Sequence, residues 1–433
     1  MQQQSPFVSV IILTHNRRNI LLRVLEALCL QTFPAERMEV IVVANGCNDG
    51  TQAMLAEYAS CSPFSLVSVE ISQSSPGAAR NQGAEMARGR LLIFLDDDIQ
   101  VSPQLVEAHV NAQQEGGERA VVGYLAPVLL TQSGLFKSEL RIWWEAMYTL
   151  MQRDGYRFSY TDLLSGNFSI RADLFNRLGG FNPDLIVHED YEFGYRLIQA
   201  EASIVYAEQA RGEHLITTSL AESLRRKYLE GVADVRIGRL YPRLRPHLFI
   251  SRLMRFSRMP SIFLRTLAFR WPWLGARIVA VLHLALVLCD RMKLRSFWLR
   301  LLYGMMNYHY WRGVSQELKS LAELKSFLGY TQEAGAADET EVEIDLEAGL
   351  RAAEHKLDEA HPTSVRIYYQ GRMVGRLPPQ PGSERLRGVH LAPILTTDLL
   401  APLLRTLAAA GAVQDWELSH KIMREMSRKR YGI

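Results

Sequence analysis

The stretch LLIFLDDD, residues 91–98, decides the fold and places the candidate site. Its five successive apolar residues predict a strand that is buried on both faces, as in a parallel sheet. The three carboxylates that follow, Asp96, Asp97 and Asp98, must lie where this strand leaves the core. They repel one another unless a cation lies among them, and hard divalent cations prefer carboxylate oxygen. We therefore predict a Mg²⁺ or Mn²⁺ site at the carboxyl edge of a sheet, with a solvated acidic loop as the alternative.

Three further strands precede this one, because apolar runs at 7–13, 40–43 and 66–71 alternate with helical patterns. Such alternation predicts an α/β fold with a mainly parallel sheet and right-handed crossovers. Polar turns follow the first two strands at the same edge as the acidic triplet. A helix that Ser75 and Pro76 can start leads into the fourth strand. The polar turn residues at this edge include Thr14, His15, Asn16, Arg17, Asn45 and Asp49, and Arg80, in the opening turns of the helix, could reach a phosphate or a nucleobase.

Four motifs in this order resemble an inverting family 2 glycosyltransferase of the nucleotide-sugar-binding type called GT-A. The motifs are SVIILTHNR (9–17), VIVVANGCNDGT (40–51), PGAARNQGAEMARGRLLIFLDDDI (76–99) and GNFSIRADLFNRLGGFNPDLIVHEDYEFGYRL (166–197). The resemblance implies that Asp96 and Asp98 hold the metal, that Asp96 and Asp97 hold the donor diphosphate, and that the turn residues and Arg80 line the nucleotide. Many members have an acidic residue, credited with recognition of the nucleobase, where this chain has Ala44. A UDP-sugar is the favoured donor, and Ala44 leaves the nucleotide open.

The pair Glu189-Asp190 resembles the Glu-Asp pair of the family. Inverting transfer needs one carboxylate to take the proton of the acceptor hydroxyl while a metal steadies the leaving diphosphate. The resemblance implies that Asp190 is this base, with Glu189 as an acceptor-binding residue or a substitute base. The alternative for Asp190 is a helix N-cap, a common position for aspartate.

His214 matches a histidine from which related enzymes often supply a third metal contact, and a structural histidine is the alternative. The predicted metal ligands are therefore Asp96, Asp98 and His214. Trp143 and Trp144 are acceptor candidates because a ring can stack on a sugar face, although aromatic residues at this density are usually core. Gly166 would let a ligand approach the backbone, and Asn167 could hold a hydroxyl.

Residues 236–300 contain fourteen Arg or Lys against one acid, Asp290, which gives a net charge of +13. Trp and Phe are interspersed with the arginines, a pattern that favours contact with an anionic membrane surface over nucleic acid. The longest apolar run, 278–289, has about twelve residues, whereas a bilayer span needs roughly twenty. We expect a peripheral membrane contact; a helical extension with its arginines in solvent is the alternative.

The chain divides into a catalytic domain (1–235), a basic helical extension (236–328) and a small α+β module of unassigned role (338–433). Its four cysteines lack paired spacing, and no basic segment precedes the first apolar run, so we expect no disulfides and no signal peptide. These features predict a cytoplasmic protein at the inner face of the membrane.

The sequence therefore predicts a metal-dependent inverting glycosyltransferase that moves a sugar from a nucleotide sugar to a hydroxyl. The expected acceptor is a glycan or a lipid-linked precursor of a cell-surface glycan. The first alternative is a nucleotidyltransferase that makes nucleotide sugars, although no glycine-rich loop with a basic residue follows 7–13. The second alternative is a non-catalytic sugar-binding scaffold.

Overall fold

The computed structural model describes residues 7–114, 116–129, 134–255, 259–329 and 340–411. The chain forms two compact units. The first unit consists of Met1–Thr149 and Ser159–Tyr330, and the second of Leu150–Phe158 and Thr331–Ile433.

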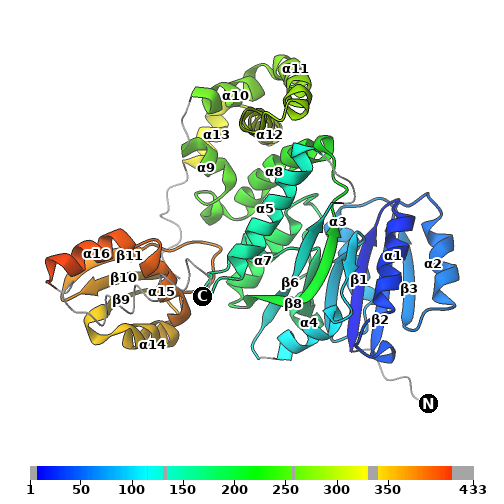
Figure 1. Ribbon diagram of the computed structural model, residues 1–433, viewed down its shortest axis with the longest axis horizontal. Helices are drawn as coiled ribbons and strands as arrows, with labels where there is room; N and C mark the ends of the chain where they lie inside the picture. Colours follow the sequence, from blue (N-terminus) through cyan, green and yellow to red (C-terminus); the bar gives the residue numbers. More distant parts are fainter. Residues whose placement is uncertain (1–6, 115, 130–133, 256–258, 330–339, 412–433) are drawn as a thin grey trace. The chain divides into compact units, whose positions relative to one another are not determined.

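An eight-stranded mixed sheet lies at the centre of the first unit, in the order β3-β2-β1-β4-β7-β6-β8-β5 (Figure 1). The strands are β1 (Val8–Thr14), β2 (Met38–Asn45), β3 (Ser65–Ile71), β4 (Leu91–Asp96), β5 (Ile99–Val101), β6 (Arg119–Val128), β7 (Asn167–Arg171) and β8 (Ser203–Leu215). The first four in spatial order are parallel, and β7 runs antiparallel to both of its neighbours. The predicted mainly parallel sheet is confirmed.

The centre of the sheet is buried because its strands carry uninterrupted apolar side chains. All residues from Leu91 to Leu95 in β4 are buried, and β4 lies between β1 and β7. Helix α3 (Pro76–Met86) begins as predicted, since the Ser75 hydroxyl accepts a hydrogen bond from the Ala78 amide at 3.2 Å. It packs closely on the sheet at Gly83, where an added Cβ would lie 2.5 Å from Cγ2 of Ile11.

Further helices surround the sheet and continue into the basic extension. Those between strands are α1 (Arg18–Leu28), α2 (Thr51–Ala59), α4 (Leu105–Gln114), α5 (Leu135–Met151), α6 (Ala172–Arg177) and α7 (Glu189–Gln199). Those that follow are α8 (Leu220–Leu240), α9 (Phe249–Arg255), α10 (Met259–Arg270), α11 (Pro272–Arg291), α12 (Arg295–Glu317) and α13 (Leu321–Leu328). Helix α8 continues through the expected boundary at residue 235, and the extension belongs to the same compact unit as the sheet.

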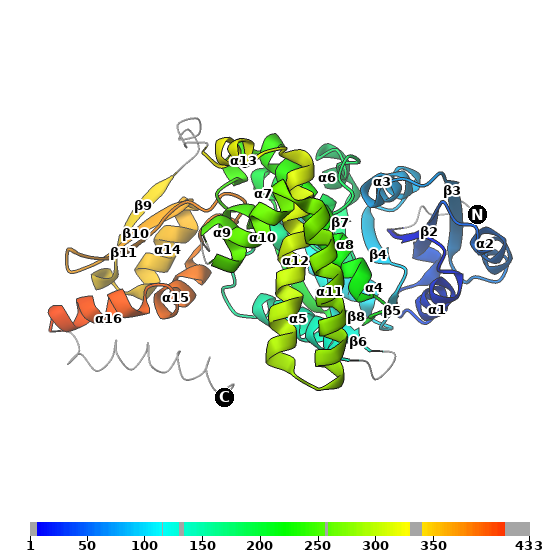
Figure 2. The same ribbon diagram turned by 90° about the horizontal axis from the view of Figure 1, so that it is seen from above.

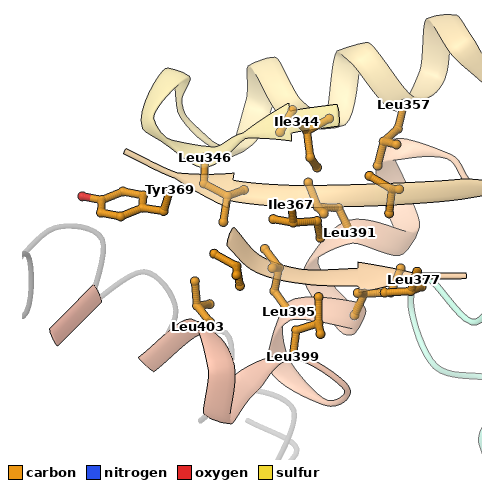
Figure 3. Packing of buried hydrophobic residues seen from close by; sticks show 14 of the residues in the cluster. Ile344, Leu346, Leu357, Ile367, Tyr369, Leu377, Leu391, Leu395, Leu399 and Leu403 are labelled. Carbon is orange, nitrogen blue, oxygen red and sulfur yellow. The ribbon is translucent and has the colours of Figure 1, made fainter. Parts of the chain in front are cut away.

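The second unit is an α+β module with its own core, shown in Figure 3. Its strands are β9 (Glu341–Asp345), β10 (Ser364–Tyr369) and β11 (Arg372–Leu377), and its helices are α14 (Leu350–Ala360), α15 (Gly388–Thr396) and α16 (Leu400–Ala409). Gln370 and Gly371 join β10 to β11 with positive φ at both positions, as a tight hairpin turn requires. Residues 150–158 join this module, because the Phe158 amide donates to Oε1 of Glu384 at 3.0 Å.

Within the described residues, α11 is a helix of 20 residues with a mean hydropathy of 1.9, long and apolar enough to cross a membrane. The apolar run of residues 278–289 forms only the central and later part of this helix, which also includes Gly275, Ala276 and Arg277. The bent pair α15 and α16 passes the same test only if both helices count as one span, and its apolar residues form part of the core of the second unit.

The close approach at Gly83 can be tested by substitution. We expect Gly83→Ala to lower the free energy of unfolding by about 1–3 kcal/mol, because the new methyl group overlaps the stiff side chain of Ile11. Gly304→Ala in α12 is the matched control, since no atom lies within 4 Å of its added Cβ, and it should raise stability by about 0.5–1 kcal/mol. Urea titration of both variants provides the measurement, and equal effects would contradict the packing of α3 on β1.

Candidate active site

The acidic triplet lies where β4 ends, next to the end of β1. Leu13 pairs with Asp96 across the two parallel strands, and the Thr14 hydroxyl donates to Oδ2 of Asp97 at 2.7 Å. Asp97 and Asp98 are buried, whereas 40% of the Asp96 side chain is exposed. The three carboxylates therefore differ in their environments, and Asp96 is the most accessible to a ligand.

A guanidinium group lies between two of these acids. Nη1 of Arg17 donates to Oδ1 of Asp97 at 2.9 Å and to Oδ2 of Asp98 at 3.0 Å. Burial raises the pKa of Asp97 to about 6 although Arg17 opposes it, and burial with the charge of Asp96 raises the pKa of Asp98 to about 6. Arg17 thus provides some of the positive charge that three adjacent carboxylates require.

Arg80, on α3, connects the triplet to the second acidic motif. Its Nη2 donates to Oδ1 of Asp96 at 2.9 Å, and its Nη1 donates to Oε1 of Glu189 at 2.7 Å. Arg80 and Glu189 are both buried, and their pairing brings the start of α7 to the end of β4. The two acidic motifs therefore converge on one site, as the sequence predicts.

Glu189 and Asp190 have different partners within this site. Glu189 is occupied by Arg80, and burial together with the charge of Asp190 raises its pKa. Asp190 accepts hydrogen bonds from the amide of Tyr191 at 2.9 Å and, more weakly, from the amide and hydroxyl of Ser165 at 3.4 Å. No basic side chain within ion-pair distance of Asp190 is present in the described structure, so Asp190 is the better candidate to accept a proton.

The turns after β1 and β2 lie together at the same edge. The His15 ring bonds the carbonyl of Asn45 at 2.6 Å, and Oδ1 of Asn16 accepts from the amide of Asn48 at 2.8 Å. A cavity of about 360 Å³ is lined by Asn16, Arg17, Arg18, Asn19, Ile20 and Asp49. A larger cavity of about 440 Å³, between α8, α11 and α12, is lined by none of the predicted site residues.

The side chains of Asn45 and Asp49 form hydrogen bonds to neighbouring residues of the turns. Nδ2 of Asn45 donates to the carbonyl of Ser74 at 3.1 Å, and Oδ1 of Asn45 accepts from the backbone N–H of Ser74 at 2.8 Å. Asp49 accepts from the backbone of Arg18 at 2.9 Å and from the hydroxyl of Thr51 at 2.5 Å. Both residues shape the nucleotide edge by fixing its turns.

His214 lies in β8, with Nε2 3.8 Å from Oδ1 of Asp98. Its Nδ1 is buried without a hydrogen-bond partner, and burial lowers the pKa of the ring, which keeps it in the neutral form that binds metals. Among the described residues, no three His, Cys, Asp or Glu side chains are arranged closely enough to hold a metal ion. Of the three predicted ligands, His214 and Asp98 lie close to each other, and Asp96 is the most accessible carboxylate.

The acceptor candidates are placed unequally. Trp144, on α5, packs its ring edge-on against His214 with ring centres 5.4 Å apart, and Trp143 lies next to it with more than half of its surface exposed. The Gly166 carbonyl accepts from the amide of Asp96 at 3.0 Å, and an added Cβ at Gly166 would lie 2.9 Å from Oδ2 of Asp96. Gly166 therefore borders the acidic triplet, Trp144 lies against His214, and Trp143 is connected to this region through Trp144.

Asn167 does not fit the predicted acceptor-binding role. It is only 1% exposed, its Oδ1 lies 2.9 Å from the ring of His109, and its Nδ2 donates to the carbonyl of Ala210 at 2.8 Å. Both amide atoms therefore join β7 to α4 and β8, which gives Asn167 a structural role.

A network behind α7 was not foreseen from the sequence. His188 has a φ of +63°, its ring stacks on Tyr191 with centres 4.4 Å apart, and its Nδ1 lies 3.5 Å from Oδ1 of Asp234. Asp234, on α8, also accepts a hydrogen bond from the hydroxyl of Tyr310 on α12. This network fixes the backbone just before Glu189. Only the sequence position of His188 next to the Glu-Asp pair could have indicated it.

Comparison with known proteins agrees with the fold described above. Residues 9–179 match the model of glycosyl transferase family 2. This part of the chain is a family 2 glycosyltransferase domain. The match and the sheet topology confirm the GT-A fold, and they favour a glycosyltransferase over a nucleotidyltransferase or a scaffold.

Individual relatives cover different parts of the chain. Glycosyltransferase AglE from Haloferax volcanii is 28% identical over 243 residues, which are 55% of this chain and 77% of that protein. A validoxylamine A glucosyltransferase from Streptomyces hygroscopicus is 32% identical over 216 residues, 44% of this chain and about half (51%) of that protein. The solved mannosyltransferase PcManGT from Pyrobaculum calidifontis, in complex with GDP-Man and Mn²⁺, has a TM-score of 0.46 and 16% identity, covering 71% of this chain and 87% of that one.

The pairing of Arg80 can be tested by its removal. We expect Arg80→Met to lower the free energy of unfolding by about 3–5 kcal/mol, because it leaves Asp96 and the buried Glu189 without their partner. Adding Glu189→Gln to this variant should recover part of the loss, since one unpaired buried charge disappears. Arg171→Met is the matched control: its ion pair with Asp173 is exposed, so the loss should stay within about 1 kcal/mol in the same urea titration.

The His188 network predicts a pH dependence of stability. Burial lowers the pKa of His188, but the nearby carboxylate of Asp234 outweighs burial and raises it overall. A raised pKa means that protonated His188 stabilises the fold below its unfolded pKa of about 6.5, and that this contribution is lost as pH rises through the folded value. Asp234→Asn keeps an acceptor for Tyr310 but removes the charge. Its free energy of unfolding should therefore fall less than that of the wild type between about pH 6 and about pH 8, a range that contains the unfolded pKa of about 6.5 and extends above it. Asp173→Asn, at an exposed site, should retain the wild-type slope.

Proposed function

We propose that this domain is a metal-dependent inverting glycosyltransferase that uses a nucleotide-sugar donor, with a UDP-sugar favoured. The observation that carries the proposal is the convergence of the triplet and the Glu189-Asp190 pair on Arg80. Asp96 to Asp98 would hold the donor diphosphate and the metal, and Asp190 would face the acceptor.

Mg²⁺ or Mn²⁺ would be held by Asp96, Asp98 and His214, where it would supply positive charge to the leaving diphosphate. The protein residues divide the other tasks. Arg17 and the turns after β1 and β2 border the cavity at the nucleotide edge. Arg80 keeps Asp96 and Glu189 in fixed positions, so the donor and the base are aligned.

The transfer step follows from the position of Asp190. An oxygen of its carboxylate takes the proton of the acceptor hydroxyl, and the hydroxyl oxygen forms a bond to the anomeric carbon. The bond from that carbon to the diphosphate breaks, and the nucleoside diphosphate leaves with its electron pair. Attack from the face opposite the leaving group inverts the configuration at this carbon.

Trp143, Trp144 and Gly166 would contact the acceptor, since Gly166 borders Asp96, Trp144 packs on His214 and Trp143 lies next to Trp144. We propose a glycan or lipid-linked precursor of a cell-surface glycan as the acceptor class, and the cytoplasmic face of a membrane as the location. Both follow from the basic, aromatic-rich extension that shares a compact unit with the sheet.

The base assignment is tested by Asp190→Asn. A thermal-shift panel of nucleoside diphosphates and nucleotide sugars with Mn²⁺ first identifies the donor, because a ligand that binds only the folded protein raises the melting temperature. The variant should bind this donor about as well as the wild type. Its rate of donor turnover, including slow transfer to water, should fall by about 10²–10⁴-fold because the general base is missing.

Asp173→Asn, an exposed aspartate that pairs with Arg171, serves as the control and should retain full turnover. Turnover by Asp190→Asn at more than half the wild-type rate would show that the base lies elsewhere. Turnover of a nucleoside triphosphate with a sugar phosphate, with release of pyrophosphate, would instead favour the nucleotidyltransferase.

A further inference from the structure

One face of α11 is apolar and exposed along the whole helix. Its exposed large apolar residues include Val281 at 65%, Leu284 at 72% and Leu288 at 57% exposure. Only 17% of the 18-residue apolar stretch of this helix is buried. The exposed positions recur every three or four residues, which places them on one side of the helix. Such a continuous apolar face on a folded protein marks an interaction surface.

The opposite face of α11 is fixed to the rest of the unit. Gly275 lies against the ring of Tyr308 on α12, where an added Cβ would meet ring atoms at 2.4 Å. Leu286 and Cys289 are buried in a cluster with Trp298 of α12. Figure 2 shows α11 and α12 side by side over much of their length. The helix therefore has one covered and one uncovered face.

Basic residues lie at both ends of the apolar face, and two tryptophans lie at its start. Trp271 and Trp273 are exposed at its start, where the guanidinium of Arg277 lies 5.5 Å from the centre of the Trp273 ring. Arg291 and Lys293 are exposed at its end. Tryptophan and long basic side chains prefer the head-group level of a bilayer, whereas aliphatic side chains prefer the acyl region.

We infer that α11 binds in the plane of an anionic membrane surface, with Val281, Leu284 and Leu288 inserted among the acyl chains and the basic ends at the head groups. The net charge of +13 over residues 236–300 complements anionic lipid. Two copies of this face would instead bring like charges together, which disfavours self-association.

The contacts of the helix disfavour a membrane-crossing arrangement. Because α11 is packed on α12 from Gly275 to Cys289, a crossing α11 would take α12 into the acyl region with it. Helix α12 contains Arg295, Arg300 and Arg312, whose burial in hydrocarbon is costly. The in-plane orientation is independent of the proposed catalysis, and it would bring the active-site unit close to a lipid-linked acceptor.

Flotation of the full-length protein with vesicles tests this inference without donor or acceptor. We expect it to float with vesicles of phosphatidylcholine and phosphatidylglycerol about ten times more than with phosphatidylcholine alone. The double substitution Leu284→Glu/Leu288→Glu should abolish flotation. Leu30→Glu, at an exposed leucine outside this helix, is the matched control and should float like the wild type.

The outcomes separate the possible partners. Absence of flotation with both vesicles, or unchanged flotation of the double variant, would overturn the inference. So would a dimer by sedimentation that the double substitution dissociates while vesicles fail to bind, because a second copy would then cover the face. Alkaline carbonate should release the protein from anionic vesicles, and retention would show a crossing helix. An unchanged melting temperature and unchanged donor binding would show that the double variant is folded, so that its loss of flotation reports on membrane binding.

Discussion

The buried guanidinium of Arg80, held between Asp96 and Glu189, is the interaction on which the site depends. It joins the end of β4 to the first turn of α7, and thereby fixes where Asp190 lies relative to the triplet. Burial of an ion pair costs desolvation, so such a group is weak evidence of a purely stabilising role. Positioning of two functional segments explains its presence better than stability does.

The sheet and the triplet were predictable because their signals are local. Strands buried on both faces need uninterrupted apolar residues, and LLIFL in β4 meets this requirement within five positions. The start of α3 was likewise predictable, because Ser75 is a favourable N-cap residue and Pro76 a favourable first residue of a helix. The pairing of Arg80 with Glu189 has no local signal. This pairing was not predicted; the order of motifs that resemble a family implied only that the triplet and the Glu189-Asp190 pair serve the same reaction.

The features that the sequence did not predict depend on distant partners or on surroundings. Asn167 reads as a ligand residue beside Gly166, but His109 and Ala210 use both ends of its amide. Asp234 and Tyr310 lie in ordinary helical patterns, and only the packing of α8 on α12 brings them behind His188. The apolar run of residues 278–289 did not reveal the full extent of α11, because the helix also accommodates Arg277 near its first turn.

The partners of the triplet also divide its work. Thr14 and Arg17 occupy Asp97, so this residue mainly holds the loop after β4 in place. Asp98 shares Arg17 but also faces the ring of His214, whose Nδ1 is buried without a hydrogen-bond partner. Asp96 is the most exposed of the three and is oriented by Arg80. A metal ion held by Asp96 and Asp98 would therefore be linked, through one guanidinium, to the helix that carries the base.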